Sequence, residues 1–173
     1  MCCQKMDSIN SIRLRGVIME DFVNYCLPSM FLISSFCDWK CCTEGGFSKD
    51  VCQNSGLMKT DIVEYSFDTI YHAYVSNDIS KAIVIGGLEP FQQFQEVYEL
   101  ICFFRKNGCD DKFVIFTGFT EEEIEDCVSK LAPLKNIVIK FGRFVPGHHP
   151  HYDKVLGINL ASDNQYGREI KCV

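Results

Sequence analysis

The sequence lacks the features that mark several large classes of protein. No apolar run approaches the ~20 residues that a helix needs to span a bilayer. Residues 1–15 carry polar and charged side chains where a secretory signal needs an apolar core. The chain has 17 basic and 23 acidic residues, and no Lys/Arg-rich stretch offers a surface for a phosphate backbone. We therefore expect a soluble, cytoplasmic protein that binds neither a membrane nor nucleic acid.

Linkers and repeats are absent as well. No Pro/Gly/Ser-rich stretch, internal repeat or low-complexity tract divides the chain. Hydrophobic residues make up 47% of the sequence and aromatic residues 13%, which supplies enough apolar surface to offset the chain entropy lost on folding. We expect a single compact domain over residues 1–173.

Cysteine, in contrast, is abundant. The chain has 11 cysteines in 173 residues. A secreted scaffold held by disulfides would be shorter and richer in loops. In a reducing compartment the thiols stay free, so cysteines that lie close together in the sequence suggest a metal site.

Apolar patterns predict how the chain is organised. Buried strands are predicted at residues 29–34, 82–85, 113–116 and 137–139, and amphipathic helices near residues 67–75, 94–104 and 120–131. The last helix begins with a capping box of Thr120 and Glu123. This alternation is typical of an α/β fold with a mostly parallel sheet. Such sheets bind ligands at the carboxyl ends of their strands, so we expect Cys37, Gly86-Gly87 and Thr117-Gly118, which each follow a predicted strand, to meet at one rim.

Four cysteines follow the first of these strands within sixteen residues, and they are Cys37, Cys41, Cys42 and Cys52. Thiolates are soft ligands, and cysteine-rich loops select zinc or iron–sulfur clusters. The spacing contains no Cys-x2-Cys pair, so it fits a tetrahedral zinc site poorly. Three thiolates on a four-iron cluster would leave one iron open to a small ligand. From the spacing alone, both a metal site and a group of unliganded thiols stay open. Cys102 and Cys127 lie on apolar helix faces, where a cysteine is typically a small buried hydrophobe.

Residues 21–41 resemble the opening of the radical S-adenosylmethionine family, in particular the small activating protein of the anaerobic ribonucleotide reductase. That family has a strand that ends in Cys-x3-Cys-x2-Cys. Cys37 and Cys41 match the first two cysteines, and Cys52 matches the third across an insertion of about eight residues. The resemblance implies a 4Fe–4S cluster on Cys37, Cys41 and Cys52, with Cys42 as an alternative to Cys41.

Further stretches resemble the family in the same order, so the resemblance covers residues 20–166. Residues 86–91 resemble a Gly-Gly-acidic-Pro stretch that binds the amino group of the methionine moiety, although Leu88 is an extra residue within it. Residues 116–122 resemble an aromatic-Thr-Gly-aromatic-Thr turn, and residues 141–144 and 160–165 resemble the C-terminal motifs.

The resemblance implies a binding site for S-adenosylmethionine formed by Gly86, Gly87, Glu89, Pro90, Thr117 and Gly118. Glycines let the backbone approach a ligand closely. We expect Glu89 to be an exposed charge that assists the ammonium group and contributes modestly.

The resemblance also implies a fold and an activity. The fold is a partial (β/α) barrel with the cluster at its rim. One electron from the reduced cluster would break a sulfur–carbon bond of S-adenosylmethionine, giving methionine and a 5′-deoxyadenosyl radical. In the activating proteins this radical takes a hydrogen atom from a glycine of a glycyl-radical enzyme, here of the anaerobic ribonucleotide reductase type. A donor such as flavodoxin or ferredoxin would supply the electron.

Two other functions stay open at this point. The inserted residues and Leu88 are compatible with a radical S-adenosylmethionine enzyme that acts on another target. The second open function is that of a non-enzymatic, cysteine-rich module that binds zinc or a cluster. His148, His149 and His151 lie near Asp153 and offer a divalent metal site, but the Pro and Gly residues between them favour an exposed turn that contacts a partner.

Overall fold

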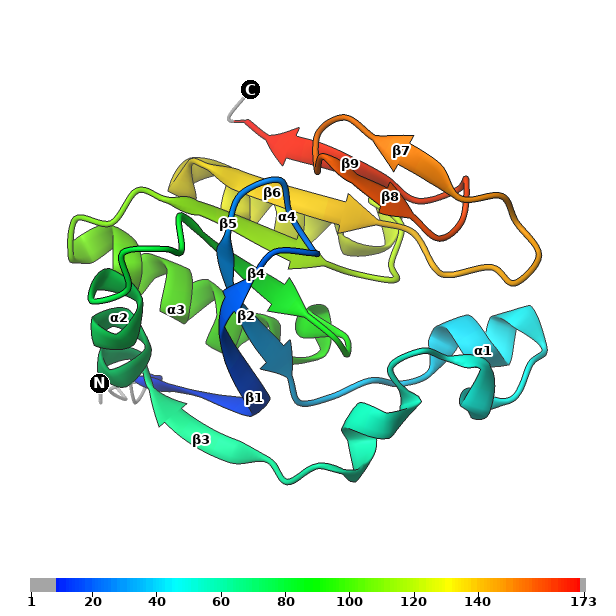
Figure 1. Ribbon diagram of the computed structural model, residues 1–173, viewed down its shortest axis with the longest axis horizontal. Coiled ribbons are helices and arrows are strands. Elements are labelled where there is room, and N and C mark those ends of the chain that lie inside the picture. The colour runs from blue at the N-terminus through cyan, green and yellow to red at the C-terminus, as the bar shows by residue number, and fades with distance from the viewer. Residues whose placement is uncertain (1–8, 172–173) are drawn as a thin grey trace, which may run out of the picture.

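Helices pack on one face of a seven-stranded sheet in the computed structural model, which describes residues 9–171 (Figure 1). The strand order is β3-β1-β2-β4-β5-β6-β9. The strands of this sheet are β1 (Ser11–Asp21), β2 (Ser29–Ser34), β3 (Val63–Ser66), β4 (Ala82–Gly86), β5 (Lys112–Phe116), β6 (Ile137–Phe141) and β9 (Tyr166–Ile170). A separate two-stranded sheet consists of β7 (His151–Asp153) and β8 (Ile158–Leu160).

The four central strands, β2, β4, β5 and β6, run parallel and coincide with the four apolar runs, which confirms those predictions. Ile85 on β4 pairs with Leu32 on one side and with Ile115 on the other, and Ile115 pairs with Ile139. Rows of apolar side chains therefore cross the sheet, and all four of these residues are buried. Strands covered on both faces read as continuous hydrophobic runs, which is why the sequence pattern identifies them.

The helices predicted near residues 67–75, 94–104 and 120–131 are present, although the last is α-helical only from Glu125, and the structure adds a short helix over residues 40–45 that was not predicted. The α-helices are α1 (Lys40–Gly45), α2 (Phe67–Val75), α3 (Phe94–Lys106) and α4 (Glu125–Leu131). Short 3-10 helices are η1 (Lys49–Val51), η2 (Ser55–Lys59), η3 (Pro90–Gln93), η4 (Glu122–Ile124) and η5 (Ala132–Leu134). The Thr120 amide donates to Glu123 Oε2 over 2.8 Å, so half of the predicted capping box forms, but it precedes η4 rather than α4 itself. Across residues 9–171, no helix combines the length and the apolar character needed to cross a membrane.

Antiparallel strands flank the parallel centre. β1 pairs antiparallel with both β2 and β3, and β9 pairs antiparallel with β6. Three of the six pairings in the sheet are therefore antiparallel, and within residues 9–171 the edge strands β3 and β9 do not pair with each other. The architecture is a mixed α/β fold with a large open sheet, and the more specific partial barrel is not shown.

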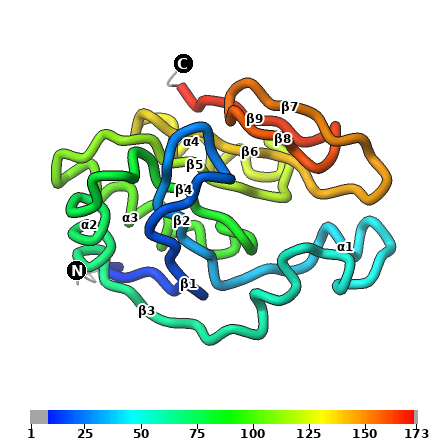
Figure 2. Tube along the Cα trace, in the orientation of Figure 1, coloured from blue at the N-terminus to red at the C-terminus, as the bar shows by residue number. Residues whose placement is uncertain are grey.

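Two apolar layers hold the sheet. On the helix side, Phe104 of α3 packs against Phe113 of β5 with ring centroids 5.2 Å apart. On the other side, Tyr25 and Leu156 cover the sheet in a smaller cluster of buried residues. The segment between β1 and β2, which carries Tyr25, runs across that side of the sheet (Figure 2).

The connection from β2 to β3, residues 35–62, is named here the cysteine loop. It carries α1, η1 and η2 and extends beyond the ends of the strands (Figure 1). Cys37, Cys41, Cys42 and Cys52 all lie in this loop. Because β2 and β3 lie on opposite sides of β1, the loop crosses from one side of β1 to the other.

Candidate metal centre

The carboxyl ends of β2, β4 and β5 meet at one rim, as the topology predicts. The Glu89 amide, which follows β4, donates to the Phe36 carbonyl beside Cys37 over 2.7 Å. Glu89 Oε1 accepts from Thr117 Oγ1 at the end of β5 over 2.8 Å. Residues near the ends of three strands are thus joined through Glu89. This juxtaposition confirms the predicted rim.

Glu89 is buried, with 7% of its surface exposed, so the expectation of an exposed charge is wrong. Besides Thr117, its Oε1 accepts from the Phe91 amide over 3.1 Å, and its Oε2 accepts from the Gly118 amide over 2.8 Å. Burial raises the pKa of Glu89 to about 7, and the hydrogen bonds from Gly118, Thr117 and Phe91 oppose the rise. Leu88, the extra residue, is also buried.

Lys140 is a buried cation in the same region. Its Nζ donates to the Gly142 carbonyl over 2.8 Å, and the Thr117 carbonyl lies 3.4 Å away. Burial lowers the pKa of Lys140 to about 8, while the nearby charges of Glu89 and Cys41 oppose that change. No role for Lys140 was predicted from the sequence. A signal was available, because a lysine interrupts an otherwise apolar strand.

Cys37 and Cys41 both face this rim. The Trp39 amide donates to Cys37 Sγ over 3.3 Å. A Cβ on Gly118 would lie 3.3 Å from Cys41 Sγ and 3.6 Å from Glu89 Oε2, so the glycine leaves room for the sulfur. Burial raises the pKa of Cys37 to about 12, and the charges of Cys41 and Glu89 add to the rise. Burial raises the pKa of Cys41 as well.

Cys42 and Cys52 occupy different environments. Cys42 is buried, with 3% of its surface exposed, whereas Cys52 is half-buried at the end of η1. Burial is the main cause that raises the pKa of the Cys41 thiol, and the charges of Cys42 and Cys52 add to the rise. Cys41, in contrast to Cys42, contacts the rim through Gly118. This contact favours Cys41 as the second ligand.

The donor set fits an iron–sulfur cluster. Cys37, Cys41 and Cys52 are free thiols, half-buried, on a loop at the rim. Within residues 9–171, no three His, Cys, Asp or Glu side chains are placed to hold a single metal ion. Cluster thiolates bind separate irons, so a four-iron group does not require its ligands to converge on one point.

The other cysteines of the described residues lie away from the rim. Cys102 is on α3, and Cys127 is on α4, where it packs against the helix-side core. Cys109 lies between α3 and β5, and Cys26 is exposed between β1 and β2. Cys2, Cys3 and Cys172 lie outside the described residues.

Packing leaves little room for a side chain at Gly86, which ends β4, or at Gly87, which follows it. A Cβ on Gly86 would lie 3.0 Å from Phe116 Cβ and 3.3 Å from a Phe31 ring carbon. Gly87 has a φ of 82°, and a Cβ there would lie 3.0 Å from side-chain carbons of both Ile33 and Leu57. Leu57 belongs to η2, so Gly87 lets the cysteine loop approach the end of β4.

Charged side chains tie α1 to the far side of the rim. Arg143, which follows β6, makes two hydrogen bonds of 2.7 Å to the carboxylate of Glu123 and pairs with Glu44 Oε2 over 2.9 Å. Lys40 Nζ lies 2.6 Å from Glu123 Oε1. The bonds from Arg143 and Lys40 hold the pKa of Glu123 below its usual range. Lys40 and Glu44 belong to α1, so this network connects the helix that carries Cys41 to residues 123 and 143.

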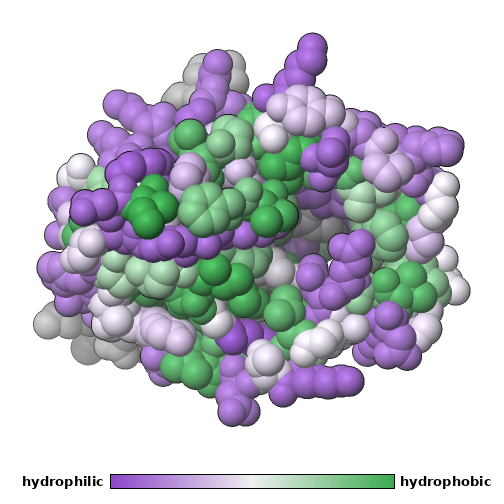
Figure 3. Space-filling view, viewed as in Figure 1, coloured by the Kyte–Doolittle hydropathy of each residue, from purple (hydrophilic) through white to green (hydrophobic). Residues whose placement is uncertain are grey.

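A cavity of about 400 Å³ adjoins this network. Its lining residues are Cys41, Glu44, Gly45, Phe47, Arg143, Phe144, Val145 and Pro146. The surface on this side is hollowed between the cysteine loop and the strand ends (Figure 3). The cavity is therefore lined by a predicted iron ligand, by the charged side chains of Glu44 and Arg143, and by apolar side chains.

The matched C-terminal motifs also meet here. Asn164 Nδ2 donates to the Arg143 carbonyl over 2.9 Å, and Gln165 Nε2 donates to the Gly142 carbonyl over 3.3 Å. The Gly142 amide donates to the Phe119 carbonyl over 3.0 Å. Residues 141–144 and 160–165 thus support the turn that follows β5.

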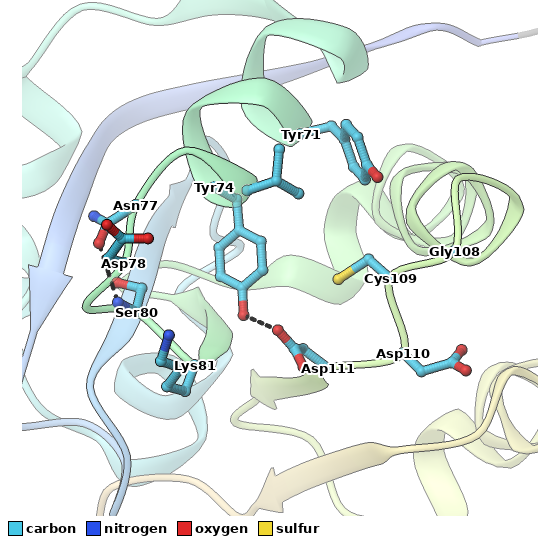
Figure 4. Close-up of a pocket in the computed structure, with 11 residues that line it drawn as sticks. Tyr71, Tyr74, Asn77, Asp78, Ser80, Lys81, Gly108, Cys109, Asp110 and Asp111 are labelled. Carbon is cyan, nitrogen blue, oxygen red and sulfur yellow. Dashed lines mark hydrogen bonds between the residues drawn. The ribbon is translucent and has the colours of Figure 1, made fainter.

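A second pocket, of about 350 Å³, lies at the opposite ends of the strands (Figure 4). It is lined by residues that precede β4 and β5, including Lys81 and Asp110. Tyr74 Oη donates to Asp111 Oδ2 across it over 2.6 Å, and Asn77 Oδ1 accepts from the Ser80 amide over 3.1 Å. Parallel sheets bind ligands at their carboxyl ends, so this pocket is not the candidate site.

The histidine stretch does not gather around Asp153. Asp153 is buried, and its carboxylate accepts from the amides of Leu156 and Gly167, each over 2.8 Å. His148 Nδ1 instead lies 2.6 Å from Asp163 Oδ1. The carboxylate of Asp153 shapes the turn between β7 and β8.

Comparison with known proteins places these features in a family. No curated protein and no solved structure matches the chain. The sequence model of the family described as "4Fe-4S single cluster domain" matches residues 29–164, from the first residue of β2 to the C-terminal motif. The match includes the whole cysteine loop and the strand ends around Glu89 and Thr117. The chain therefore belongs to the family of 4Fe–4S single cluster domains.

Proposed function

We propose that the chain holds its 4Fe–4S cluster on Cys37, Cys41 and Cys52 and uses it to cleave S-adenosylmethionine. The supporting observation is the approach of Cys41 Sγ to Gly118, where an added Cβ would lie 3.3 Å from the sulfur, at the rim that also holds Cys37 and Glu89. Three thiolates on a four-iron cluster leave one iron for a small ligand. When bound, the cluster supplies the single electron that splits S-adenosylmethionine into methionine and a 5′-deoxyadenosyl radical.

The protein residues of the rim would bind and orient S-adenosylmethionine. The proposed site keeps Gly86, Gly87, Glu89, Pro90, Thr117 and Gly118, with one change of role. Both carboxylate oxygens of Glu89 already accept hydrogen bonds, so Glu89 fixes the turn after β5 rather than reaching for the ligand. The cavity beside Cys41 is large enough for part of a nucleoside, and Phe47 and Phe144 would exclude water there.

The radical would be passed to a partner protein. The open sheet supports this proposal, since the strand ends are not enclosed by a closed barrel in the described residues. The proposed partner is a glycyl-radical enzyme of the anaerobic ribonucleotide reductase type, and residues 141–144 and 148–151 would contact it. The electron would come from a flavodoxin or a ferredoxin.

Anaerobic reconstitution with iron and sulfide, followed by a reductant and S-adenosylmethionine, tests the first step. The expected product is 5′-deoxyadenosine, from the wild type and from Cys127→Ala but not from Cys37→Ala. A zinc-containing, colourless protein without this product would contradict the proposal and favour the module that binds metal without catalysis.

Adding a reductase encoded beside the chain tests the partner. An oxygen-sensitive glycyl radical on the reductase, seen by electron paramagnetic resonance, is the expected result. If 5′-deoxyadenosine forms and the reductase gains no radical, the enzyme acts on another target. The inserted residues of the cysteine loop are the feature that favours this second candidate.

A further inference from the structure

Arg15 on β1 contacts the cysteine loop at both of its ends. Its Nε donates to the Ser35 carbonyl over 2.9 Å, two residues before Cys37. One of its terminal nitrogens donates to the Met58 carbonyl over 3.0 Å and also to the Thr60 carbonyl. All four cysteines of the loop lie between these contacts. One guanidinium group therefore joins the chain before the first cysteine to the chain after the last.

The chemistry of these contacts makes the closure rigid. Hydrogen bonds from a charged donor are stronger than neutral ones, and guanidinium is a planar fork with donors in fixed directions. Arg15 lies next to Leu14, which pairs with both Ser34 of β2 and Val63 of β3. The Arg15 side chain therefore starts from the part of β1 that lies between the two ends of the cysteine loop.

We propose that Arg15 is a positioning residue for the cluster. It holds the loop ends at the separation from which Cys37, Cys41 and Cys52 reach one four-iron group, and it does not contact that group itself. This inference rests on the proposed assignment of the three ligands. The proposal gives a role to a residue far outside the cysteine motif, because Arg15 lies in β1 and the whole of β2 separates it from Cys37 in the sequence.

The chain contains a matched control for this proposal. The guanidinium of Arg105 donates to the carbonyls of Leu134, Cys109 and Lys135 over 2.8, 2.7 and 3.1 Å. It makes the same kind of contacts to main-chain carbonyls, but in the loops before β5 and β6, at the opposite ends of the strands. Arg105→Gln therefore removes similar interactions without touching the cysteine loop.

The experiment compares Arg15→Gln, Arg15→Lys and Arg105→Gln with the wild type after anaerobic reconstitution. The measurements are iron and sulfide per chain, the paramagnetic resonance spectrum of the reduced cluster, and the rate of iron loss to a chelator. Thermal unfolding of the iron-free proteins reports the general loss of stability. We expect Arg15→Gln to lose iron about tenfold faster than Arg105→Gln, the size of effect typical of groups that orient metal ligands. The spectrum of Arg15→Gln should also change.

Arg15→Lys keeps the proposal testable if Arg15→Gln does not fold. Lysine keeps the charge but cannot bridge the two loop ends as a fork, so we expect a folded protein that still loses iron faster than the wild type. Iron loss at the wild-type rate from Arg15→Lys, or at the Arg105→Gln rate from Arg15→Gln, would overturn the proposal. If the wild type binds a cluster that survives loss of Cys37 or Cys52, the ligand assignment fails instead, which is a separate result.

Discussion

Thr117 Oγ1 donates a hydrogen bond of 2.8 Å to Oε1 of Glu89, and both groups are buried. Thr117 Oγ1 in turn accepts from the Phe119 amide over 3.0 Å. The turn after β5 is therefore built around a carboxylate that follows β4. Since the same turn contains Gly118 and contacts Cys41, the position of a predicted iron ligand depends on a side chain that binds no iron.

The stability of the iron-free protein should fall as the pH rises from about 5 to 8, and Glu89 should cause part of this fall. Burial raises the pKa of Glu89 from 4.5 to about 7, so the folded chain binds this proton more tightly than the unfolded chain. The stabilisation from the bound proton is complete below pH 4.5 and is lost as the pH passes through about 7. In urea titrations, the stability of Glu89→Gln relative to the wild type should increase over this range by about 1–3 kcal/mol. If the stability of Glu89→Gln and that of the wild type change with pH in parallel, Glu89 does not titrate in this pH range.

Gly118→Ala should weaken iron binding while the fold survives. The added Cβ would lie 3.3 Å from Cys41 Sγ and crowd the sulfur. Gly56→Ala is the control, since a Cβ there meets nothing within 4 Å and the residue lies in the same cysteine loop. Iron per chain after reconstitution is the measurement, with circular dichroism to check folding. Equal iron content in the two variants would mean that Cys41 does not depend on the space at Gly118.

Single Cys→Ala variants should separate the ligands from the other thiols. We expect loss of Cys37, Cys41 or Cys52 to abolish the absorbance of the cluster, and loss of Cys102 or Cys127 to leave it intact. Cys42→Ala is the informative case. Because Cys42 is buried and Cys41 contacts the rim, this variant should keep its cluster at a modest cost in stability, on the order of 1 kcal/mol. If Cys42→Ala loses the cluster and Cys41→Ala keeps it, the second ligand is Cys42.

Gly87→Ala should impair the cluster as well as the binding of S-adenosylmethionine. From the sequence alone, we expect a larger side chain at Gly86 or Gly87 to disturb only S-adenosylmethionine. The structure alters this expectation, because a side chain at Gly87 would need a positive φ and would meet Leu57 of the cysteine loop at 3.0 Å. We expect a destabilisation of about 1–2 kcal/mol and a lower iron content, measured by chemical denaturation and iron analysis. A wild-type iron content together with weakened cofactor binding would restore the simpler expectation.

Arg143→Lys should loosen α1. Lysine cannot make the paired hydrogen bonds to Glu123 and also reach Glu44, so the network that holds α1 loses its centre. Hydrogen exchange of the amides of residues 42–46 should become faster by several-fold. Arg168→Lys, which alters an ion pair with Glu121 elsewhere, is the control and should leave these amides unchanged. Unchanged exchange in Arg143→Lys would mean that α1 is held by other contacts.

The parts of the fold that the sequence predicts are those with the strongest periodic patterns. Strands β2, β4, β5 and β6 are buried on both faces, so their residues are mostly apolar. β1 was not predicted, although the buried Ile12 and Leu14 alternate with Arg13 and Arg15 in the period-two pattern of a half-buried strand, so here a signal was available. β3, β7 and β8 have only three or four residues, too few to show a period.

The rim could be predicted for a topological reason, whereas its details could not. Parallel neighbouring strands must end at one edge, which places Cys37, Gly86 and Thr117 together before any contact is known. Glu89 is buried against Thr117 and Gly118 of the next strand end, and Arg15 contacts the loop only because β1 inserts between β2 and β3. Such relationships join residues far apart in sequence, and they leave no local pattern.

The position of β3 also has a consequence for how iron would be lost. β3 has four residues, forms one edge of the sheet and is exposed at Val63 and Glu64. Short edge strands open at a low free-energy cost, well before the whole protein unfolds. When β3 detaches from β1, the segment after Cys52 loses one of its anchors and keeps the Arg15 hydrogen bonds to Met58 and Thr60, while Cys37 remains fixed to the end of β2. Release of iron should therefore begin at Cys52, through partial opening of this edge rather than through global unfolding.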